Sequence, residues 1–381
     1  MKNIAFICEY NPFHLGHLKQ IEYIKDKFLG EEIRIICIMS GNFVQRGNFA
    51  LSHKYKRAEF AVRYGADLVL EHPFPYCMGR AEDFAGGAVD IINSLGNIDY
   101  ICCGSECADV ERIYQSADRL SSNEFKSRLS ERAKKDFSIS YASLREHLYF
   151  EMYGEELLTT PNDVLALEYT QALIERSSKS KLIVNPRVKG YSATRSREVI
   201  GERSVDDYTR LLPEHVAHYY KSGKMMDFSV LDSFISLYFF LSDPKSFENV
   251  YEMNFDLASK IKAASSKVHT AEELVCAVSD KRYTKARVRR AILSSILGLN
   301  NSEICPKVPY TAVLGASSKG REYIGSLNST IPVITRKAEL QRGTAEMKAF
   351  ELSQKADRLF ERLAIENGVE ILKKPYVIGE N

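Results

Sequence analysis

The residues best placed for chemistry are His14 and His17, in the string CEYNPFHLGHLKQ at 8–20. An apolar run precedes this string and a stretch with helical character follows it, so the histidines mark a turn from strand to helix. The free N–H groups and positive dipole at a helix start attract anions, and Gly16 leaves room for a phosphate beside the backbone. Imidazoles donate to phosphate oxygens and stabilise charge that develops in nucleotidyl transfer. The pattern therefore predicts a nucleoside triphosphate site with His14 and His17 as its catalytic residues.

Two other interpretations of the same residues remain. A strand-to-helix turn can carry two surface histidines with no function, because a four-residue pattern recurs by chance. A zinc site is less favoured, since two histidines three residues apart have no further ligands nearby. The position of the motif after the first strand of an alternating series favours the phosphate site.

The first half of the chain alternates between continuous apolar runs and amphipathic stretches. Strands are predicted at 3–10, 33–40, 66–73, 99–106 and 180–188, and helices at 15–28, 52–65, 81–96 and 192–202. Residues 108–178 are predicted to be mainly helical. Apolar runs without alternation are typical of strands covered on both faces, so we expect an α/β fold with a doubly wound, Rossmann-like parallel sheet. This first domain is placed at 1–203.

The second half, 204–381, is predicted to be a mainly α-helical domain. Helical periodicity covers 205–222, 226–241, 245–264 and 270–279, a basic segment leads into an apolar helix at 281–300, and a last helix is expected at 344–367. Residues 308–336 have the pattern of a strand, a helix and a strand.

Composition narrows the class of protein. The chain of 381 residues is 45% apolar and 27% charged with a net charge of +2, which is typical of a soluble globular protein. Its first apolar stretch is too short for a signal peptide and no run reaches the length of a membrane span. The eight cysteines contain no C-x-x-C pair, which favours reduced thiols in a cytoplasmic protein.

Longer strings give the chain a family resemblance. H-x-G-H after a first strand is the hallmark of the nucleotidylyltransferase superfamily, and EYNPFHLGHL, MSGNFVQRG and CCGSE resemble the bacterial tRNA(Met) cytidine acetate ligase family. PNDVLALEY, SATRSR, RYTKARVRRAIL and PYTAVLGASSKGRE follow in the expected order, so the resemblance covers essentially the whole chain. It implies an enzyme that activates acetate with ATP to acetyl-adenylate. The acetyl group then passes to N4 of the wobble cytidine of elongator tRNA(Met).

The resemblance also implies an ATP site, position by position. It places Arg197 near the phosphates, and Gly104, Asn162 and Arg187 around the nucleotide, with Mg²⁺ expected to accompany ATP. The ATP loop comprises Ile7, Cys8, Glu9, Tyr10, Asn11, Pro12, Phe13, His14, Leu15, Gly16, His17, Leu18, Lys19 and Gln20.

Two further polar segments are assigned to substrates. The loop after the second predicted strand is expected to hold the acyl group or pyrophosphate through Ser40, Asn42, Gln45 and Arg46. Arg57 and Glu59, on the following helix, are predicted to lie on a solvated face. The basic stripe predicted to bind a tRNA stem comprises Arg282, Lys285 and Arg289 on one helical face, with Lys319 and Arg321.

Two other functions remain compatible with these motifs. One is a nucleotidyltransferase for a small phosphorylated metabolite, which needs no RNA. The other is a noncatalytic, nucleotide-gated RNA-binding protein, which binds ATP and tRNA without releasing pyrophosphate.

Overall fold

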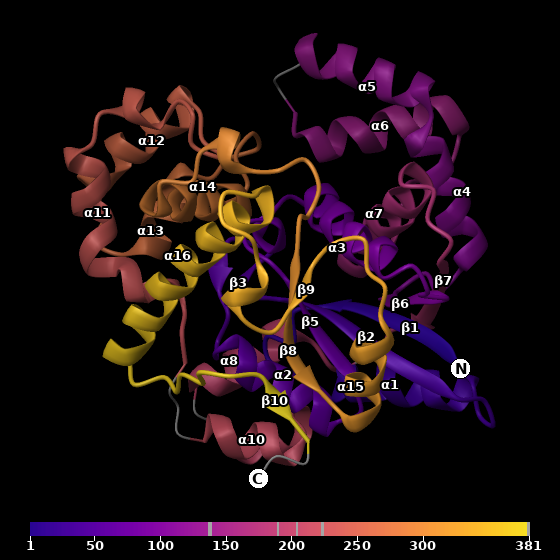
Figure 1. Cartoon of the computed structure of the whole chain (residues 1–381). Coiled ribbons are helices and arrows are strands. Elements are labelled where there is room, and N and C mark those ends of the chain that lie inside the picture. Colours follow the sequence, from indigo (N-terminus) through magenta and orange to yellow (C-terminus); the bar gives the residue numbers. More distant parts are fainter. Residues whose placement is uncertain (136–138, 189, 203–204, 222–224, 379–381) are drawn as a thin grey trace.

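The centre of the computed structural model is a parallel sheet whose strands follow the predicted apolar runs (Figure 1). The structure describes residues 1–135, 139–188, 190–202, 205–221 and 225–378. Five strands lie in the order β5-β2-β1-β6-β7 and are parallel to one another. They are β1 (Lys2–Cys8), β2 (Ile33–Ser40), β5 (Leu68–His72), β6 (Tyr100–Ser105) and β7 (Lys181–Pro186). The predicted doubly wound parallel sheet is confirmed.

The strand register brings the chemical motifs to one edge of the sheet. Cys8 pairs with Met39, and Ser40 pairs with His72, so β1, β2 and β5 end side by side. In an open parallel sheet the ligand crevice lies outside these carboxyl ends. The loops that follow β1, β2 and β6 therefore converge where the sequence predicts the nucleotide.

Helices cover both faces of the sheet, as expected for strands that are apolar throughout. One apolar cluster joins the sheet to α1 (Leu15–Lys27), α2 (Lys54–Arg63) and α8 (Ala193–Glu202). A second cluster joins the opposite face to α3 (Ala81–Leu95), α4 (Val110–Ser121) and α7 (Pro161–Glu175). Helices α5 (Asn123–Lys135) and α6 (Tyr141–Tyr153) extend this second layer as an arm (Figure 1).

A third apolar cluster forms the core of a helical lobe beside the carboxyl edge of the sheet. Its α-helices are α11 (Asp232–Leu241), α12 (Phe255–Ser265), α13 (Ala271–Val278), α14 (Lys285–Leu297) and α16 (Ala345–Glu366). The helix predicted at 205–222 is instead two helices, α9 (Val205–Leu211) and α10 (Glu214–Tyr220), because Pro213 interrupts it. The helix predicted at 245–264 begins only at Phe255. Within the described residues, no helix is long and apolar enough to cross a membrane.

The sheet does not end at the predicted domain boundary near residue 203. Strand β8 (Thr311–Ala316) pairs antiparallel with β5, and β9 (Val333–Ile334) and β10 (Tyr376–Val377) each pair with β8. Helix α15 (Ser318–Ser326) lies between β8 and β9. The strand–helix–strand pattern at 308–336 is present, but it completes the first sheet instead of belonging to a separate helical domain. Helices α9 and α10, which also follow residue 203, pack in the same apolar cluster as α1, α2 and α8, so the helical lobe is only part of 204–381.

The burial of His72, at the end of β5, leads us to expect that the stability of the fold depends on pH. Its ring is fully buried, with Nε2 3.0 Å from the Phe84 carbonyl oxygen, and burial lowers its pKa to about 4. The unfolded chain binds a proton near pH 6.5 whereas the folded chain does not, so stability is lost as pH falls from about 6.5 towards 4.

We expect the unfolding free energy of the parent protein to decrease between pH 7 and pH 5. In His72→Gln, which lacks the titrating ring, this decrease should be smaller by about 2 kcal/mol. Urea unfolding at the two pH values measures this difference. A ring of the parent protein that titrates near pH 6.5 by NMR would contradict it.

Candidate active site

The two histidines of the motif lie against each other at the start of α1. His14 is the N-cap residue, and its ring stacks on that of His17 with the centroids 3.6 Å apart. The backbone N–H of His14 donates to Nδ1 of His17 at 3.2 Å. Because Nδ1 accepts, the proton of a neutral His17 is on Nε2, which makes Nε2–H available as a donor. The motif thus presents a fixed imidazole pair beside the positive end of a helix.

Both rings are neutral near pH 7. Burial, together with the smaller effect of the nearby charges of Arg187 and Arg197, lowers the pKa of His14 to about 4. Burial also lowers the pKa of His17 well below its usual value, and His14 adds to this effect. His14 Nδ1 is buried and has no hydrogen-bond partner among the residues that the structure describes. Neutral imidazoles can donate hydrogen bonds to phosphate oxygens, although they carry no positive charge themselves.

Aromatic side chains anchor the predicted ATP loop to the core of the protein. Tyr10 and Phe13 are buried in the core, with ring centroids 4.8 Å apart, and Tyr10 lies 4.9 Å from the His17 ring. The side chain of Asn11 accepts a hydrogen bond from the backbone N–H of Leu51 at 2.7 Å. These predicted ATP-loop residues therefore support the loop with their side chains.

The other members of the predicted ATP loop line the end of β1 and the first turns of α1. Gln20 Nε2 lies 3.8 Å from Cys102 Sγ, and the ammonium of Lys19 lies 4.7 Å from the centre of the Tyr191 ring. Pro12 is buried, whereas Ile7, Cys8, Leu15, Gly16 and Leu18 are half-buried.

Two arginines bring positive charge to the histidines. Arg197, on α8, donates from Nη1 to the carbonyl of Asn11 at 2.9 Å, so it is anchored to the loop that carries His14. Arg187 follows β7 and donates from Nη1 to Oε1 of Glu106 at 2.6 Å. Both residues were assigned to the nucleotide from the family resemblance, and the structure places both near His14.

Glu106 accepts hydrogen bonds from two of the predicted nucleotide residues, Arg187 and Asn162. Its Oε1 also accepts from Asn162 Nδ2 at 2.8 Å, and its Oε2 accepts from the Thr160 hydroxyl at 2.9 Å. Gly104, two residues earlier on β6, is half-buried at the same edge. Sequence reasoning missed Glu106, although it ends the CCGSE string that carried the resemblance.

The predicted substrate loop divides into buried and accessible residues. Ser40 and Asn42 are fully buried, and Asn42 is occupied by bonds to Asp357 at 2.9 Å and to the Lys54 backbone at 2.8 Å. The Asn42 side chain thus holds the loop, whereas the buried Ser40 hydroxyl has no hydrogen-bond partner among the described residues. Neither side chain is accessible for the expected substrate contact. Gln45 donates its backbone N–H to Glu9 Oε1 at 2.8 Å, and the Arg46 side chain is exposed. Gln45 and Arg46 therefore stay as the candidates for substrate contact.

The prediction that Arg57 lies on a solvated face is wrong. Arg57 is fully buried and donates to the backbone carbonyls of Glu9 at 2.6 Å, Ser40 at 3.1 Å, Ser52 at 3.2 Å and Gly41. It thereby ties the end of β1 to the end of β2. Glu59 lies on the outer side of α2 and pairs with Lys56 and Arg63 at 2.9 Å.

The predicted tRNA stripe is split between two places. Arg282 precedes α14 and pairs with Asp256 at 3.2 Å, while Lys285 and Arg289 share Glu272 at 3.7 and 2.6 Å. Lys319 and Arg321 lie on α15, where Lys319 donates to the carbonyl of Ile33 at the start of β2. This is the amino edge of the parallel strands, so the structure does not bring the two groups to one surface.

Comparison with known proteins places the chain in a family. The model of the HIGH Nucleotidyl Transferase family matches residues 1–370. The chain belongs to this family. Within it, a tRNA(Met) cytidine acetate ligase of Streptococcus pneumoniae (strain ATCC 700669 / Spain 23F-1) is 34% identical over 369 residues, covering 94% of this chain and 93% of the relative. Another from Thermoanaerobacter sp. (strain X514) is 31% identical over 371 residues, covering 91% and 92%.

A solved structure agrees along the whole chain. The crystal structure of Thermotoga maritima TmcAL bound with alpha-thio ATP has a TM-score of 0.89 and 25% sequence identity, and each chain covers 99% of the other. The membership in the tRNA(Met) cytidine acetate ligase family that the sequence motifs predicted is confirmed.

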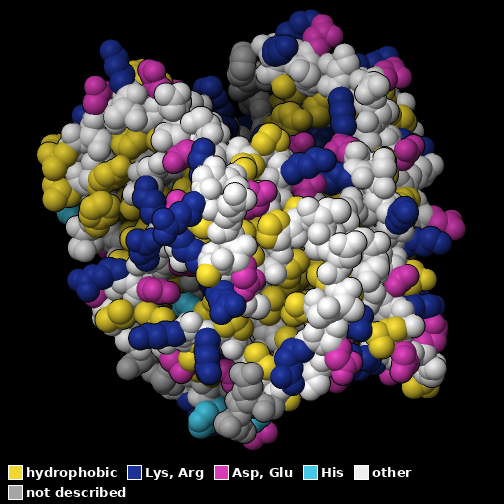
Figure 2. All heavy atoms as spheres, in the orientation of Figure 1, with side chains coloured by type: hydrophobic (Ala, Val, Ile, Leu, Met, Phe, Trp, Pro, Cys, Tyr) yellow, Lys and Arg dark blue, Asp and Glu magenta, His cyan; other side chains and the backbone are white. Residues whose placement is uncertain are grey.

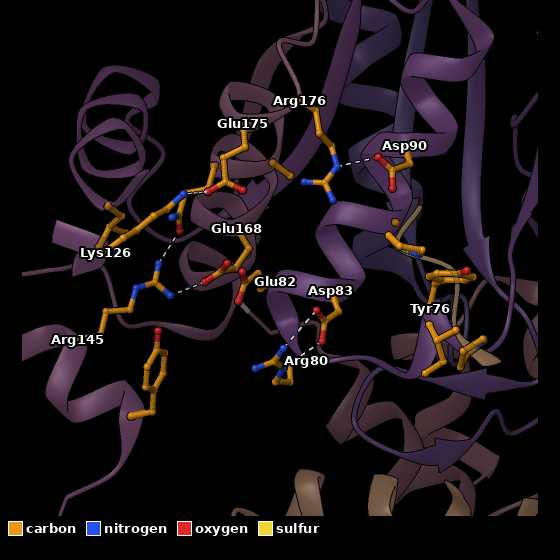
Figure 3. Close-up of a pocket in the computed structure, with 18 of the residues that line it drawn as sticks. Tyr76, Arg80, Glu82, Asp83, Asp90, Lys126, Arg145, Glu168, Glu175 and Arg176 are labelled. Atoms are coloured by element: carbon orange, nitrogen blue, oxygen red, sulfur yellow. Dashed lines mark hydrogen bonds and ion pairs between the residues drawn. The ribbon is translucent and has the colours of Figure 1, made fainter. Parts of the chain in front are cut away.

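A separate cavity of about 620 Å³ lies between α3, α7 and the arm formed by α5 and α6 (Figure 3). Its lining contains none of the predicted site residues. Each of its four cations pairs with a carboxylate: Arg80 with Asp83, Lys126 with Glu175, Arg145 with Glu168, and Arg176 with Asp90. The cavity therefore offers no uncompensated cation to an anionic ligand.

Gly16 gives a steric test of the histidine pair. A Cβ at this position would lie 2.9 Å from Cε1 of His14 and 3.0 Å from Cβ of Tyr191, so Gly16→Ala must displace the His14 ring. We expect acetate-dependent ATP–pyrophosphate exchange to fall by about 10- to 100-fold, because displacements near 1 Å have effects of this size.

The matched control is Gly325→Ala on α15, where no atom of the described part of the chain lies within 4 Å of the added carbon. Equal exchange rates for the two variants would contradict the assigned position of His14.

Proposed function

We propose that the protein is an ATP-dependent acetate ligase that acetylates N4 of the wobble cytidine of elongator tRNA(Met). The observation that carries the proposal is the stacked His14–His17 pair at the start of α1, at the carboxyl edge of a nucleotidyl transferase sheet. The names of the relatives and the nucleotide analogue bound in the Thermotoga maritima structure support the same conclusion.

The first step is attack of acetate on the α-phosphorus of ATP. A carboxylate oxygen forms a bond to phosphorus, the bond to the bridging oxygen breaks, and pyrophosphate leaves with that oxygen. The helix N-terminus and the neutral imidazoles donate to the phosphates, and Arg187 and Arg197 balance the charge on the leaving group. No side chain needs to act as the nucleophile, because acetate itself is the nucleophile.

Mg²⁺ enters this proposal as part of the ATP substrate. Among the described residues there is no group of three or more His, Cys, Asp or Glu side chains that could hold a metal ion. Mg²⁺ commonly keeps several waters and binds substrate phosphates with few protein ligands. The triphosphate would therefore supply the main ligands, and the ion would add to the charge compensation that the arginines provide.

The second step transfers the acetyl group to RNA. The N4 amine of cytidine attacks the carbonyl carbon of acetyl-adenylate, the carbon–oxygen bond breaks, and AMP leaves with the former acetate oxygen. The amine loses one proton as the amide forms. Gln45, which is half-buried beside Glu9, and the exposed Arg46 are the residues we assign to positioning of the acyl group or pyrophosphate. ATP and tRNA are cytoplasmic substrates, so we assign the enzyme to the cytoplasm.

One assay tests the proposed function. Incubation with ATP, labelled acetate and bulk tRNA should yield labelled N4-acetylcytidine, AMP and pyrophosphate. Transfer of AMP to a phosphorylated metabolite without RNA would replace the ligase with a nucleotidyltransferase. Binding of ATP and tRNA without release of pyrophosphate would replace it with a noncatalytic RNA-binding protein.

A further inference from the structure

Helix α16 carries a row of cations that the sequence motifs did not single out. Lys348, Lys355, Arg358 and Arg362 are exposed, and their spacings of seven, three and four residues place them within about 80° of one another around the helix. We call these four residues the α16 basic face. Figure 2 shows Lys and Arg side chains gathered over the part of the surface that α16 crosses in Figure 1.

The positive charge of this face is largely uncompensated. Lys348, Lys355 and Arg358 form no ion pair with any residue that the structure describes, whereas Arg362 pairs with Glu366 at 2.7 Å. The other carboxylate on this side of the helix, Glu351, pairs with Lys337 at 3.1 Å. By contrast, Arg282, Lys285 and Arg289 beside α14 are each paired within the protein. The cations of α16 are therefore free to attract a polyanion, whereas the positive charges beside α14 are already compensated by carboxylates.

The opposite side of α16 is fixed to the predicted substrate loop. Asp357 accepts from Asn42 Nδ2 at 2.9 Å and from Lys54 Nζ at 2.6 Å, and Lys54 also pairs with Glu71 at 2.7 Å. Ser353 donates to the carbonyl of Phe74 at 3.1 Å. Phe360 and Ala356 are buried in the core of the lobe. The basic face thus stands on a rigid support at the edge of the sheet that holds the histidines.

We infer that the α16 basic face binds the phosphate backbone of the RNA substrate. The identity of the RNA in this inference rests on the proposed function. The inference places the main RNA contact on α16 and not on the predicted stripe at Arg282, Lys285 and Arg289. Loop 39–47 lies between α16 and the histidine loop, since Asn42 contacts Asp357 and Gln45 contacts Glu9. Phosphates held on α16 would therefore be one loop away from the nucleotide, which suits RNA whose target base is splayed into the site.

The test is tRNA binding at several salt concentrations by the full chain. The triple variant Lys348→Ala, Lys355→Ala, Arg358→Ala keeps good helix formers on α16 and removes three free charges. We expect at least tenfold weaker binding at 0.15 M salt. The slope of log K against log salt should become shallower by about two, since each phosphate contact contributes about 0.7 to 0.9.

Two matched triples complete the design. Arg128→Ala, Lys134→Ala, Lys135→Ala removes three exposed cations from α5, and Arg282→Ala, Lys285→Ala, Arg289→Ala removes the earlier stripe. The largest loss of affinity and of salt dependence in the α16 triple supports the inference. A larger loss in either other triple, or binding by the α16 triple within twofold of the parent, overturns it. If the parent binds tRNA through α16 yet forms no N4-acetylcytidine, the proposed function fails while this inference stands.

Discussion

Replacement of His17 by alanine is expected to lower acetate-dependent ATP–pyrophosphate exchange by at least about 10²- to 10³-fold, as loss of one preorganised donor does elsewhere. The ring is neutral, its Nδ1 accepts from the His14 backbone, and its Nε2–H is the donor left for a phosphate oxygen. Alanine removes this donor and also the ring on which His14 stacks at 3.6 Å. The measurement is exchange of labelled pyrophosphate into ATP with saturating acetate and no RNA.

The matched control is His218→Ala on α10, where the side chain is exposed. This variant should exchange at the parental rate. Circular dichroism of both variants separates lost chemistry from lost structure, because a helix start can lose about 0.5 to 2 kcal/mol when its cap is disturbed. A folded His17→Ala protein with more than a tenth of the parental exchange rate would remove His17 from the mechanism.

The largest effect on stability is expected from Arg57. The guanidinium is fully buried and satisfies four backbone carbonyls at the ends of β1 and β2 and before α2. Arg57→Met keeps the apolar stem but leaves those carbonyls without their donor. We expect the unfolding free energy to fall by about 3 to 5 kcal/mol, since several buried acceptors become unsatisfied together. Urea unfolding at pH 7 measures the loss.

Arg63→Met on the same helix is the control. Arg63 is partly exposed and pairs with Glu59 at 2.9 Å, so its loss should cost less than about 1 kcal/mol. Similar losses in the two variants would show that Arg57 is an ordinary surface residue of α2, contrary to its contacts. If Arg57→Met does not accumulate as folded protein, Arg57→Lys, which retains one charged donor, should recover only part of the stability.

Hydrophobic patterning was sufficient to predict the five parallel strands of the sheet. The runs at 33–40 and 99–106 contain no alternation, and they became β2 and β6, which helices cover on both faces. The helix at 81–96 was equally clear, because its apolar stripe ends at Gly96, where the chain adopts a φ of +76°. These signals are local, so a single sequence contains them.

The parts that failed depend on contacts distant in the chain. Nothing within KYKRAEF indicates that Arg57 faces four carbonyls, three of them at the ends of β1 and β2, and burial of an arginine runs against its usual preference. Strand β8 pairs with β5 across more than 200 residues, so the boundary near 203 could not be located by local patterning. The charge compensation of Lys285 by Glu272 likewise joins two helices. Within the candidate site, the local motif was enough to predict the two histidines. The contacts of Glu106 with Arg187 and Asn162 became visible only in the folded chain.

The most direct test of the reaction uses acetate labelled with ¹⁸O in both oxygens, together with ATP and tRNA. Attack of acetate on the α-phosphorus, followed by transfer of the acetyl group, predicts one ¹⁸O atom in AMP and none in pyrophosphate, measured by mass spectrometry. Label in inorganic phosphate, or AMP that carries only oxygen from water, would contradict attack at the phosphate that the histidine loop is proposed to hold.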